Sequence, residues 1–162
     1  MSDTAAHPPA AVTLALPDQA ATEALAVRLA ALLRAGDVVA LGGDLGAGKT
    51  TLARALIRAA AGAELEVPSP TFTLVQSYEV PVGTIWHFDL YRLSGPDEVI
   101  ELGWDEARAG GIVLVEWPGR LGPLLPPDRL EIALGFGDAV DARIARLAGH
   151  GIWAARLPAL VE

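Results

Sequence analysis

The stretch from Val38 to Thr51, VVALGGDLGAGKTT, decides the fold of this chain. An apolar run leads into a glycine-rich loop, and a segment that favours a helix, 52–61, follows. Four residues fit the phosphate-loop pattern G-x-x-x-x-G-K-[ST] in the strand–loop–helix context it requires: Gly43, Gly48, Lys49 and Thr50. Glycines allow several backbone N–H groups to point at one anion, and a helix start adds partial positive charge. The stretch therefore predicts a phosphate-binding loop.

Two side chains of this loop are the first candidates for chemistry. Lys49 is expected to reach the β- and γ-phosphates, and the Thr50 hydroxyl is expected to bind Mg²⁺. Lys49 is the only lysine among 12 basic residues, so the chain uses arginine wherever a generic cation suffices. A compact ammonium differs from a planar guanidinium, which would replace it poorly here. The pattern assigns nucleotide binding to Gly43, Gly48, Lys49 and Thr50.

Length and composition favour one α/β domain with an ample core, since 52% of the 162 residues are apolar. We expect this domain to span 11–150, after a disordered tail, 1–10, and before a tail or short helix, 151–162. No apolar run approaches the roughly 18 residues of a membrane span, and no secretory signal is evident. With no cysteine, the chain is expected to be cytoplasmic, without a membrane partner. The net charge of −8 argues against autonomous binding of nucleic acid.

Hydrophobic periodicity and turn residues predict a mixed sheet flanked by helices. A turn as short as 81–83 implies an antiparallel hairpin, so a purely parallel sheet is excluded. The fold class is therefore a single-domain α/β P-loop NTPase with a mixed parallel/antiparallel sheet. The expected strands are 12–16, 38–41, 71–80, 84–91, 112–116, 130–134 and 142–147, the expected helices are 19–34, 52–61, 97–102 and 104–109, and 118–127 is an expected loop.

Two acids are candidates to complete a catalytic site. Glu116 directly follows a buried strand, which is where an Mg²⁺-binding carboxylate usually lies; the alternative is a solvated acid at a strand end. Asp89 interrupts an apolar strand, and a buried acid is costly unless it is paired or bound to a metal. It is a candidate ligand of an Mg²⁺-bound water or a water-orienting base, and the alternative is a pair with Arg92.

Other side chains carry weaker signals. Thr71 follows a Ser-Pro dipeptide and could face the γ-phosphate, or it could simply begin a strand. Trp117 could lie beside the nucleotide or in the core, and Arg92 is a less favoured transition-state cation. His87 is interpreted as structural, because no second histidine or cysteine lies near it in the sequence. A guanine-reading N-K-x-D element is impossible with a single lysine, so ATP is favoured over GTP.

Together these segments resemble the TsaE (YjeE) family, the bacterial ATPases of tRNA threonylcarbamoyladenosine biosynthesis. The resemblance covers roughly 16–134, and four motifs occur in the family's order and spacing: 43–51 (GDLGAGKTT), 69–72 (SPTF), 87–93 (HFDLYRL) and 115–118 (VEWP). It implies a P-loop NTPase domain with a mixed sheet. It also implies cytoplasmic, Mg²⁺-dependent binding of ATP with slow hydrolysis.

The resemblance further implies partners and roles for residues. The partners are the threonylcarbamoyl transferase subunit and its inactive paralogue (TsaD/TsaB type), which modify ANN-decoding tRNAs, so tRNA is contacted only indirectly. The phosphate positions of the family are matched by Gly46, Ala47, Gly48, Lys49, Thr50 and Thr51. Thr50 and Glu116 match the Mg²⁺ positions. Asp89 matches an acid needed for activity, and Asp18 a position near the base. Ala139-Val140 stands where the family often has Gly-Arg, so whether Arg143 replaces that contact stays open.

Two other functions remain open alternatives. A small-molecule P-loop kinase would need an acceptor pocket and a lid with paired arginines. The spacing of Arg143 and Arg146 suits such a lid, but both lie in an expected strand. An ATP-gated adaptor that does not hydrolyse ATP would have the same sequence features as a slow ATPase.

Overall fold

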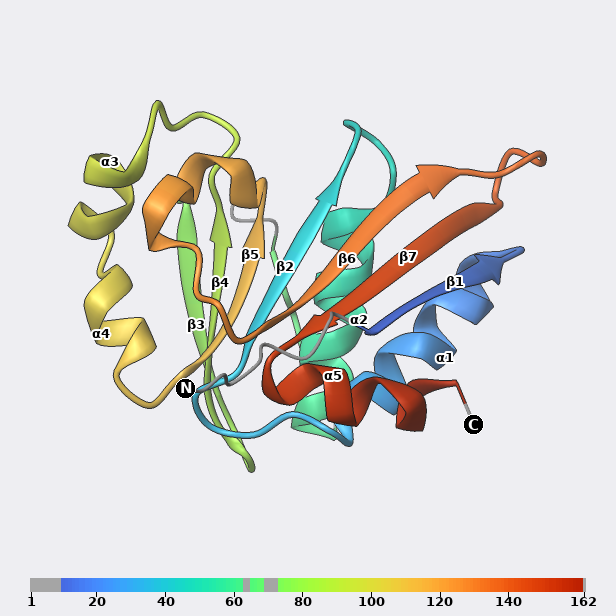
Figure 1. Ribbon diagram of the computed structural model, residues 1–162, viewed down its shortest axis with the longest axis horizontal. Coiled ribbons are helices and arrows are strands. Elements are labelled where there is room, and N and C mark those ends of the chain that lie inside the picture. The colour runs from blue at the N-terminus through green and yellow to red at the C-terminus, as the bar shows by residue number, and fades with distance from the viewer. Residues whose placement is uncertain (1–9, 63–64, 69–72, 162) are drawn as a thin grey trace, which may run out of the picture.

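The computed structural model describes residues 10–62, 65–68 and 73–161. One seven-stranded sheet has the order β1-β7-β6-β2-β5-β4-β3 (Figure 1). The strands are β1 (Ala10–Leu16), β2 (Val38–Gly43), β3 (Val75–Val80), β4 (Gly83–Asp89), β5 (Ile112–Glu116), β6 (Arg129–Phe136) and β7 (Arg143–His150). The strand β2 pairs in parallel with β5 and β6, and β4 pairs in parallel with β5. The outer pairs β1–β7, β6–β7 and β3–β4 are antiparallel, which confirms the mixed sheet.

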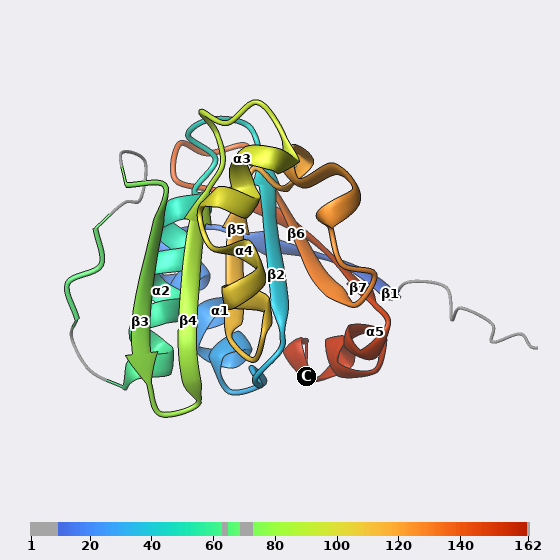
Figure 2. The same cartoon turned by 90° about the vertical axis from the view of Figure 1, so that its left-hand side faces the viewer.

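Helices cover both faces of the sheet (Figures 1 and 2). One core cluster joins α1 (Gln19–Ala30) and α2 (Lys49–Ala61) to the face of β2 that carries Val39 and Leu41. A second cluster, on the opposite face, joins α3 (Pro96–Glu101), α4 (Trp104–Arg108) and the 3₁₀ segment η1 (Pro118–Leu124) to Val38 and Ala40. Because β2 is buried on both faces, its sequence is a continuous apolar run without alternation.

The parallel pairing decides where functional residues meet. Since β2, β4 and β5 run in the same direction, their carboxyl ends lie at one edge of the sheet, at the top of Figure 1. The loop after β2 and the residues after Asp89 and Glu116 start from this edge. Ligands of open α/β sheets bind at such an edge.

Gly43 shows why this part of β2 must be glycine. It pairs with Leu134 of β6, and an added Cβ would collide with the Leu134 carbonyl oxygen. Its φ of 129° also lies in the region that favours glycine. At the other end of the loop, Gly48 has a φ of 106° and is the N-cap residue directly before α2. These two glycines shape the turn from strand to helix.

Several predicted boundaries were wrong. The first hairpin strand begins at Val75 rather than residue 71, because Leu74 has a left-handed φ of 69°; residues 69–72 lie outside the described residues. Its partner ends at Asp89, and the expected loop 118–127 contains η1. The strand expected over 142–147 continues to His150.

The end of the chain packs against the core. The helix α5 (Ile152–Arg156) and the 3₁₀ segment η2 (Leu157–Leu160) follow β7, and they bury Trp153, Leu157 and Leu160 in the cluster that contains α1 and α2. Among the described helices, none has both the length and the apolar character needed to cross a membrane.

Candidate functional site

The phosphate loop opens onto a cavity of about 320 Å³ at the carboxyl edge of the sheet. Lys49 is 4% exposed, and its Nζ donates hydrogen bonds to the carbonyl oxygens of Gly43 and Asp44, both at 2.8 Å. The cavity is lined by Leu45, Gly46, Gly48, Lys49, Thr50, Thr51, Asp89, Tyr91, Arg92, Glu116 and Trp117. The loop therefore holds its single ammonium at the cavity wall.

Glu116 connects α2 to two strands. The Thr50 hydroxyl donates a 2.8 Å hydrogen bond to Oε1 of Glu116. The other oxygen, Oε2, lies 2.6 Å from Nε2 of His87. Glu116 is 2% exposed and His87 is fully buried. Each carboxylate oxygen of Glu116 therefore has a protein partner, Thr50 or His87.

Asp89 lies beside Glu116 because the register of β4 and β5 pairs the two residues directly. Its Oδ1 accepts a 3.1 Å hydrogen bond from the Tyr91 backbone N–H, and the side chain is 5% exposed. Two carboxylates and the Lys49 side chain therefore line the same cavity.

Trp117, the residue after Glu116, also lines the cavity. It has a left-handed backbone conformation, with φ 62° and ψ 55°, which is rare for a bulky residue and recurs at functional sites. The Lys49 Nζ lies 4.2 Å from the centre of the Trp117 ring, and the Tyr91 ring lies 4.9 Å from the same ring. The ring faces the ammonium, an arrangement that favours the charged form.

The electrostatics of Lys49 combine opposing effects. Burial lowers its pKa below the usual value of 10.5, and the charges of Glu116, Asp89 and Asp44 partly counteract this shift. The ammonium is thus poorly solvated, and its proton is held less tightly than in water. An anion brought into the cavity would stabilise it.

A second cavity, of about 440 Å³, adjoins the first at Gly48 and Thr51. Asp18 lines it and caps α1 by accepting a 2.9 Å hydrogen bond from the Ala21 N–H. Arg143 lines its other side and donates through Nε to the Ala47 carbonyl oxygen at 3.1 Å. The two cavities make one elongated site on either side of the start of α2.

The structure brings most of the predicted site residues together. Those lining one or both cavities are Asp18, Gly46, Ala47, Gly48, Lys49, Thr50, Thr51, Asp89, Glu116 and Trp117. Gly43 lines neither cavity, although its carbonyl oxygen binds Lys49. Thr71 lies outside the described residues.

Two contacts of the site were not predicted from the sequence. His87 is expected to be structural, but it contacts Glu116. Arg143, whose contact with nucleotide is an open question in the sequence, binds the Ala47 carbonyl oxygen. One signal could have found His87: it precedes Asp89 by two residues in a strand, so both side chains must share a face. For Arg143, the resemblance left a nucleotide contact open, but no sequence pattern indicated its hydrogen bond to the Ala47 carbonyl oxygen of the phosphate loop.

The donor atoms of this site suit Mg²⁺. Magnesium prefers oxygen ligands and is usually bound through one or two carboxylates plus phosphate oxygens. Thr50 and Glu116 present a hydroxyl and a carboxylate 2.8 Å apart beside the phosphate loop. Within the described part of the chain, no three histidine, cysteine or acidic residues cluster as an all-protein metal site. The residues therefore fit a metal that arrives with a phosphate ligand.

Known proteins share this sequence and fold. A tRNA threonylcarbamoyladenosine biosynthesis protein TsaE from Rickettsia felis is 44% identical over 121 residues, which cover 75% of this chain and 71% of that protein. The protein of the same name from Bacillus subtilis is 42% identical over 114 residues, 70% of each chain. A crystal structure of Bacillus subtilis YdiB superposes with a TM-score of 0.73 at 31% identity, covering 96% of this chain and 94% of that one. The family model for the threonylcarbamoyl adenosine biosynthesis protein TsaE matches residues 16–144, and the chain therefore belongs to this family.

Proposed function

We propose that this chain is a cytoplasmic, Mg²⁺-dependent subunit that binds ATP and hydrolyses it slowly in threonylcarbamoyladenosine modification of ANN-decoding tRNAs. It acts on the transferase subunit and its inactive paralogue rather than on tRNA. The observation that carries the nucleotide chemistry is the Thr50 hydroxyl 2.8 Å from Glu116 in a cavity that also contains the buried Lys49 ammonium. Family membership supports the pathway.

The two adjoining cavities support a nucleoside triphosphate as the ligand. The cavity beside Lys49, Asp89 and Glu116 suits the β- and γ-phosphates, and the cavity between Asp18 and Arg143 suits the nucleoside. ATP is preferred to GTP because the only lysine is buried in the phosphate loop and cannot form a guanine-reading N-K-x-D element.

We assign roles in ATP hydrolysis to several of the residues that line the cavity. Lys49 exchanges the carbonyl oxygens of Gly43 and Asp44 for phosphate oxygens, so its charge opposes the negative charge that develops during transfer. Thr50 and Glu116 would hold Mg²⁺, which supplies charge neutralisation at the β- and γ-phosphates when bound. We assign to Asp89, whose Oδ1 accepts a hydrogen bond from the Tyr91 N–H, the role of orienting a water and accepting its proton.

Neither alternative gains support from the described residues. Arg143 and Arg146 are both within β7, and Arg143 binds the Ala47 carbonyl oxygen, so this pair does not form a kinase lid. A non-hydrolysing adaptor would need no water-orienting acid, whereas Asp89 lines the cavity beside Glu116.

Hydrolysis assays distinguish the three functions. We expect the purified chain alone to release phosphate from ATP slowly, and the transferase pair to accelerate it. Small-molecule acceptors should have no effect. Phosphate transferred to an acceptor would establish a kinase instead, and the absence of hydrolysis under all three conditions would favour the adaptor.

A further inference from the structure

His87 is a fully buried imidazole directly behind the proposed metal site. It lies on the face of the sheet that also carries Ile85 and Leu114, both in the core cluster that contains α2. A polar ring in such a position is costly unless it is paired. Its Nε2 lies 2.6 Å from Oε2 of Glu116, whereas its Nδ1 has no hydrogen-bond partner in the described part of the chain.

The contact makes the two oxygens of Glu116 unequal. The oxygen Oε1 shares the phosphate-loop side with the Thr50 hydroxyl, while the imidazole occupies Oε2. A carboxylate oxygen accepts, so the imidazole donates through Nε2–H. With that hydrogen bond in place, Glu116 presents a single oxygen toward the position of a bound cation.

A glutamate that offers only one oxygen to a cation favours some divalent cations over others. Mg²⁺ requires near-ideal octahedral geometry at about 2.0–2.1 Å, whereas Ca²⁺ accepts 6–8 oxygens and often binds a carboxylate through both of its oxygens. A glutamate free to rotate could offer both oxygens and so accommodate Ca²⁺. A glutamate held at Oε2 cannot do so without losing its partner.

We propose that His87 is a positioning residue that holds Glu116 to one exposed oxygen and thereby makes nucleotide binding selective for Mg²⁺ over Ca²⁺. The inference rests on the proposed function, because it requires a cation bound with a nucleotide. It assigns His87 no contact with nucleotide or cation, since the ring acts through Glu116.

Calorimetric binding of the non-hydrolysable analogue AMP-PNP tests the proposal, with EDTA, MgCl₂ or CaCl₂ in the buffer. Wild type should bind more tightly with Mg²⁺ than with Ca²⁺. His87→Leu removes the donor and should lower the ratio of Mg²⁺-supported to Ca²⁺-supported affinity by about 10–100-fold, the range for losing a hydrogen bond to a metal-binding carboxylate. His87→Gln, whose amide reaches the position of Nε2, should restore the ratio, and affinity in EDTA should stay within about twofold of wild type for both variants.

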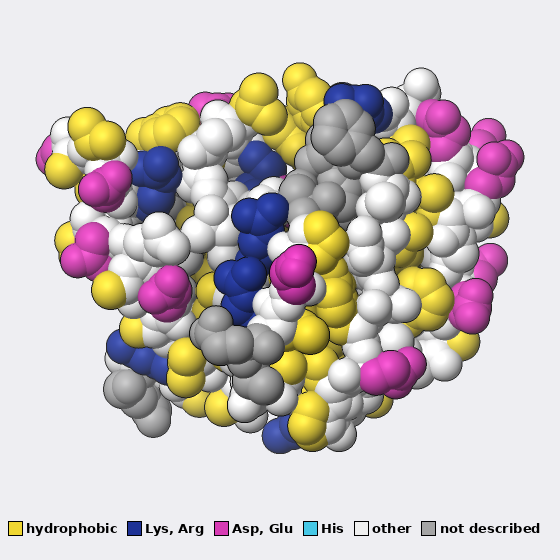
Figure 3. All heavy atoms as spheres, turned by 180° about the vertical axis from the view of Figure 1, so that it is seen from behind, with side chains coloured by type: hydrophobic (Ala, Val, Ile, Leu, Met, Phe, Trp, Pro, Cys, Tyr) yellow, Lys and Arg dark blue, Asp and Glu magenta, His cyan; other side chains and the backbone are white. Residues whose placement is uncertain are grey.

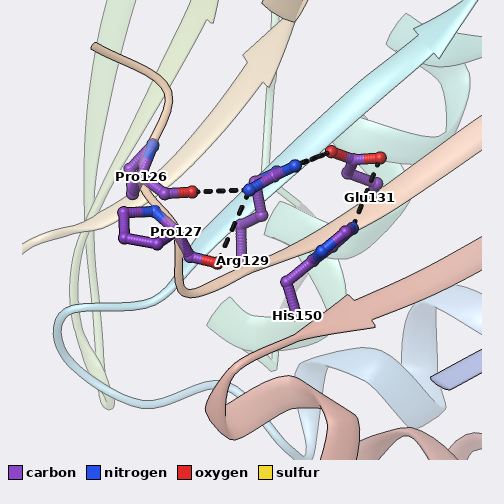
Figure 4. Close-up of polar contacts among 5 residues, drawn as sticks. All are labelled: Pro126, Pro127, Arg129, Glu131 and His150. Carbon is purple, nitrogen blue, oxygen red and sulfur yellow. Dashed lines mark hydrogen bonds and ion pairs between the residues drawn. The ribbon is translucent and has the colours of Figure 1, made fainter. Parts of the chain in front are cut away.

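The chain offers a matched control in a second histidine–glutamate contact. In Figure 4 the His150 ring points toward Glu131, 3.6 Å from Nε2 to Oε1, and Arg129 contacts the same carboxylate while binding the carbonyls of Pro126 and Pro127. None of these residues lines either cavity of the nucleotide site. His150→Leu should therefore leave the Mg²⁺/Ca²⁺ ratio at its wild-type value.

The possible outcomes distinguish a failure of this inference from a failure of the proposed function. Binding of AMP-PNP that is the same in EDTA, Mg²⁺ and Ca²⁺ for wild type would contradict the metal site itself. If wild type prefers Mg²⁺ and His87→Leu has the same ratio of Mg²⁺-supported to Ca²⁺-supported affinity, the role of His87 is overturned while the proposed function stands. If thermal melting shows that His87→Leu does not fold, His87→Asn replaces it, because its shorter amide does not reach Glu116; equal ratios for His87→Asn and His87→Gln would likewise overturn the proposal.

Discussion

Burial and three nearby acids shift the pKa of Lys49 in opposite directions. Burial lowers its pKa, and Glu116, Asp89 and Asp44 raise it again only in part. Phosphate groups beside Nζ would raise the pKa in the complex, so binding is linked to protonation of Lys49. At a pH where Lys49 of the free protein is already protonated, the affinity for a phosphate ligand does not depend on pH. The affinity falls as the pH rises through the lowered pKa of free Lys49, and it levels off above the pKa of Lys49 in the complex.

We therefore predict that ADP, measured in EDTA between pH 7 and 11, binds progressively less tightly toward the alkaline end. Lys49→Ala should abolish this dependence and weaken binding or turnover by about 2–4 kcal/mol, the scale for one charged donor in such a site. Affinity that stays level to pH 11 in wild type would show that the proton on Lys49 is not linked to phosphate binding.

The residues of the site differ in how far the sequence could locate them. Lys49 and Thr50 follow from local spacing, Glu116 from its position after a buried strand, and Asp89 from being an acid within an apolar strand. Their meeting depends on parallel pairing that brings the ends of β2, β4 and β5 to one edge. The contact of His87 with Glu116 spans 29 residues of sequence and requires the actual β4–β5 register, which no local pattern specifies.

At the scale of elements, sequence patterns located the longer helices, the buried strands and the short helices α3 and α4, but they left 151–162 as either a tail or a short helix. Five residues of α5 make less than two helical turns, too few to show a periodic apolar face. Four prolines and two glycines in 118–127 indicated a loop, although η1 forms there. Only tertiary packing shows that α5 buries a tryptophan.

Truncation of that tryptophan tests whether α5 supports the fold. Trp153 is fully buried, and the Arg156 guanidinium lies 4.6 Å from the ring centre. We predict that Trp153→Ala lowers the free energy of unfolding in urea by about 3–5 kcal/mol, as expected for a large aromatic removed from a core. Ile152→Ala, beside it in the same helix but 51% exposed, should cost under about 0.5 kcal/mol. Similar losses from both substitutions would mean that α5 contributes through its helix alone.

At the scale of the molecule, acidity dominates: 20 acidic residues oppose 12 basic ones. Several arginine side chains also donate hydrogen bonds to backbone carbonyl oxygens of the same chain. They are Arg28, Arg58, Arg108, Arg120, Arg143 and Arg156. On the face shown in Figure 3, basic side chains form a short central column, and acidic side chains lie around it and along the margins. Extended contact with a phosphate backbone would require a wider basic surface.

The last prediction follows from this charge distribution. The purified chain should show no salt-sensitive binding of tRNA in an anisotropy titration, even near 50 mM salt, because each phosphate contact would steepen the dependence of log K on log salt by about 0.7–0.9. The transferase pair should bind tRNA with a measurable slope, and adding this chain should leave that slope unchanged within error, since its acidic surface releases no phosphate counterions. A slope that steepens by two or more on its addition would place tRNA phosphates directly on this chain and contradict a role confined to its protein partners.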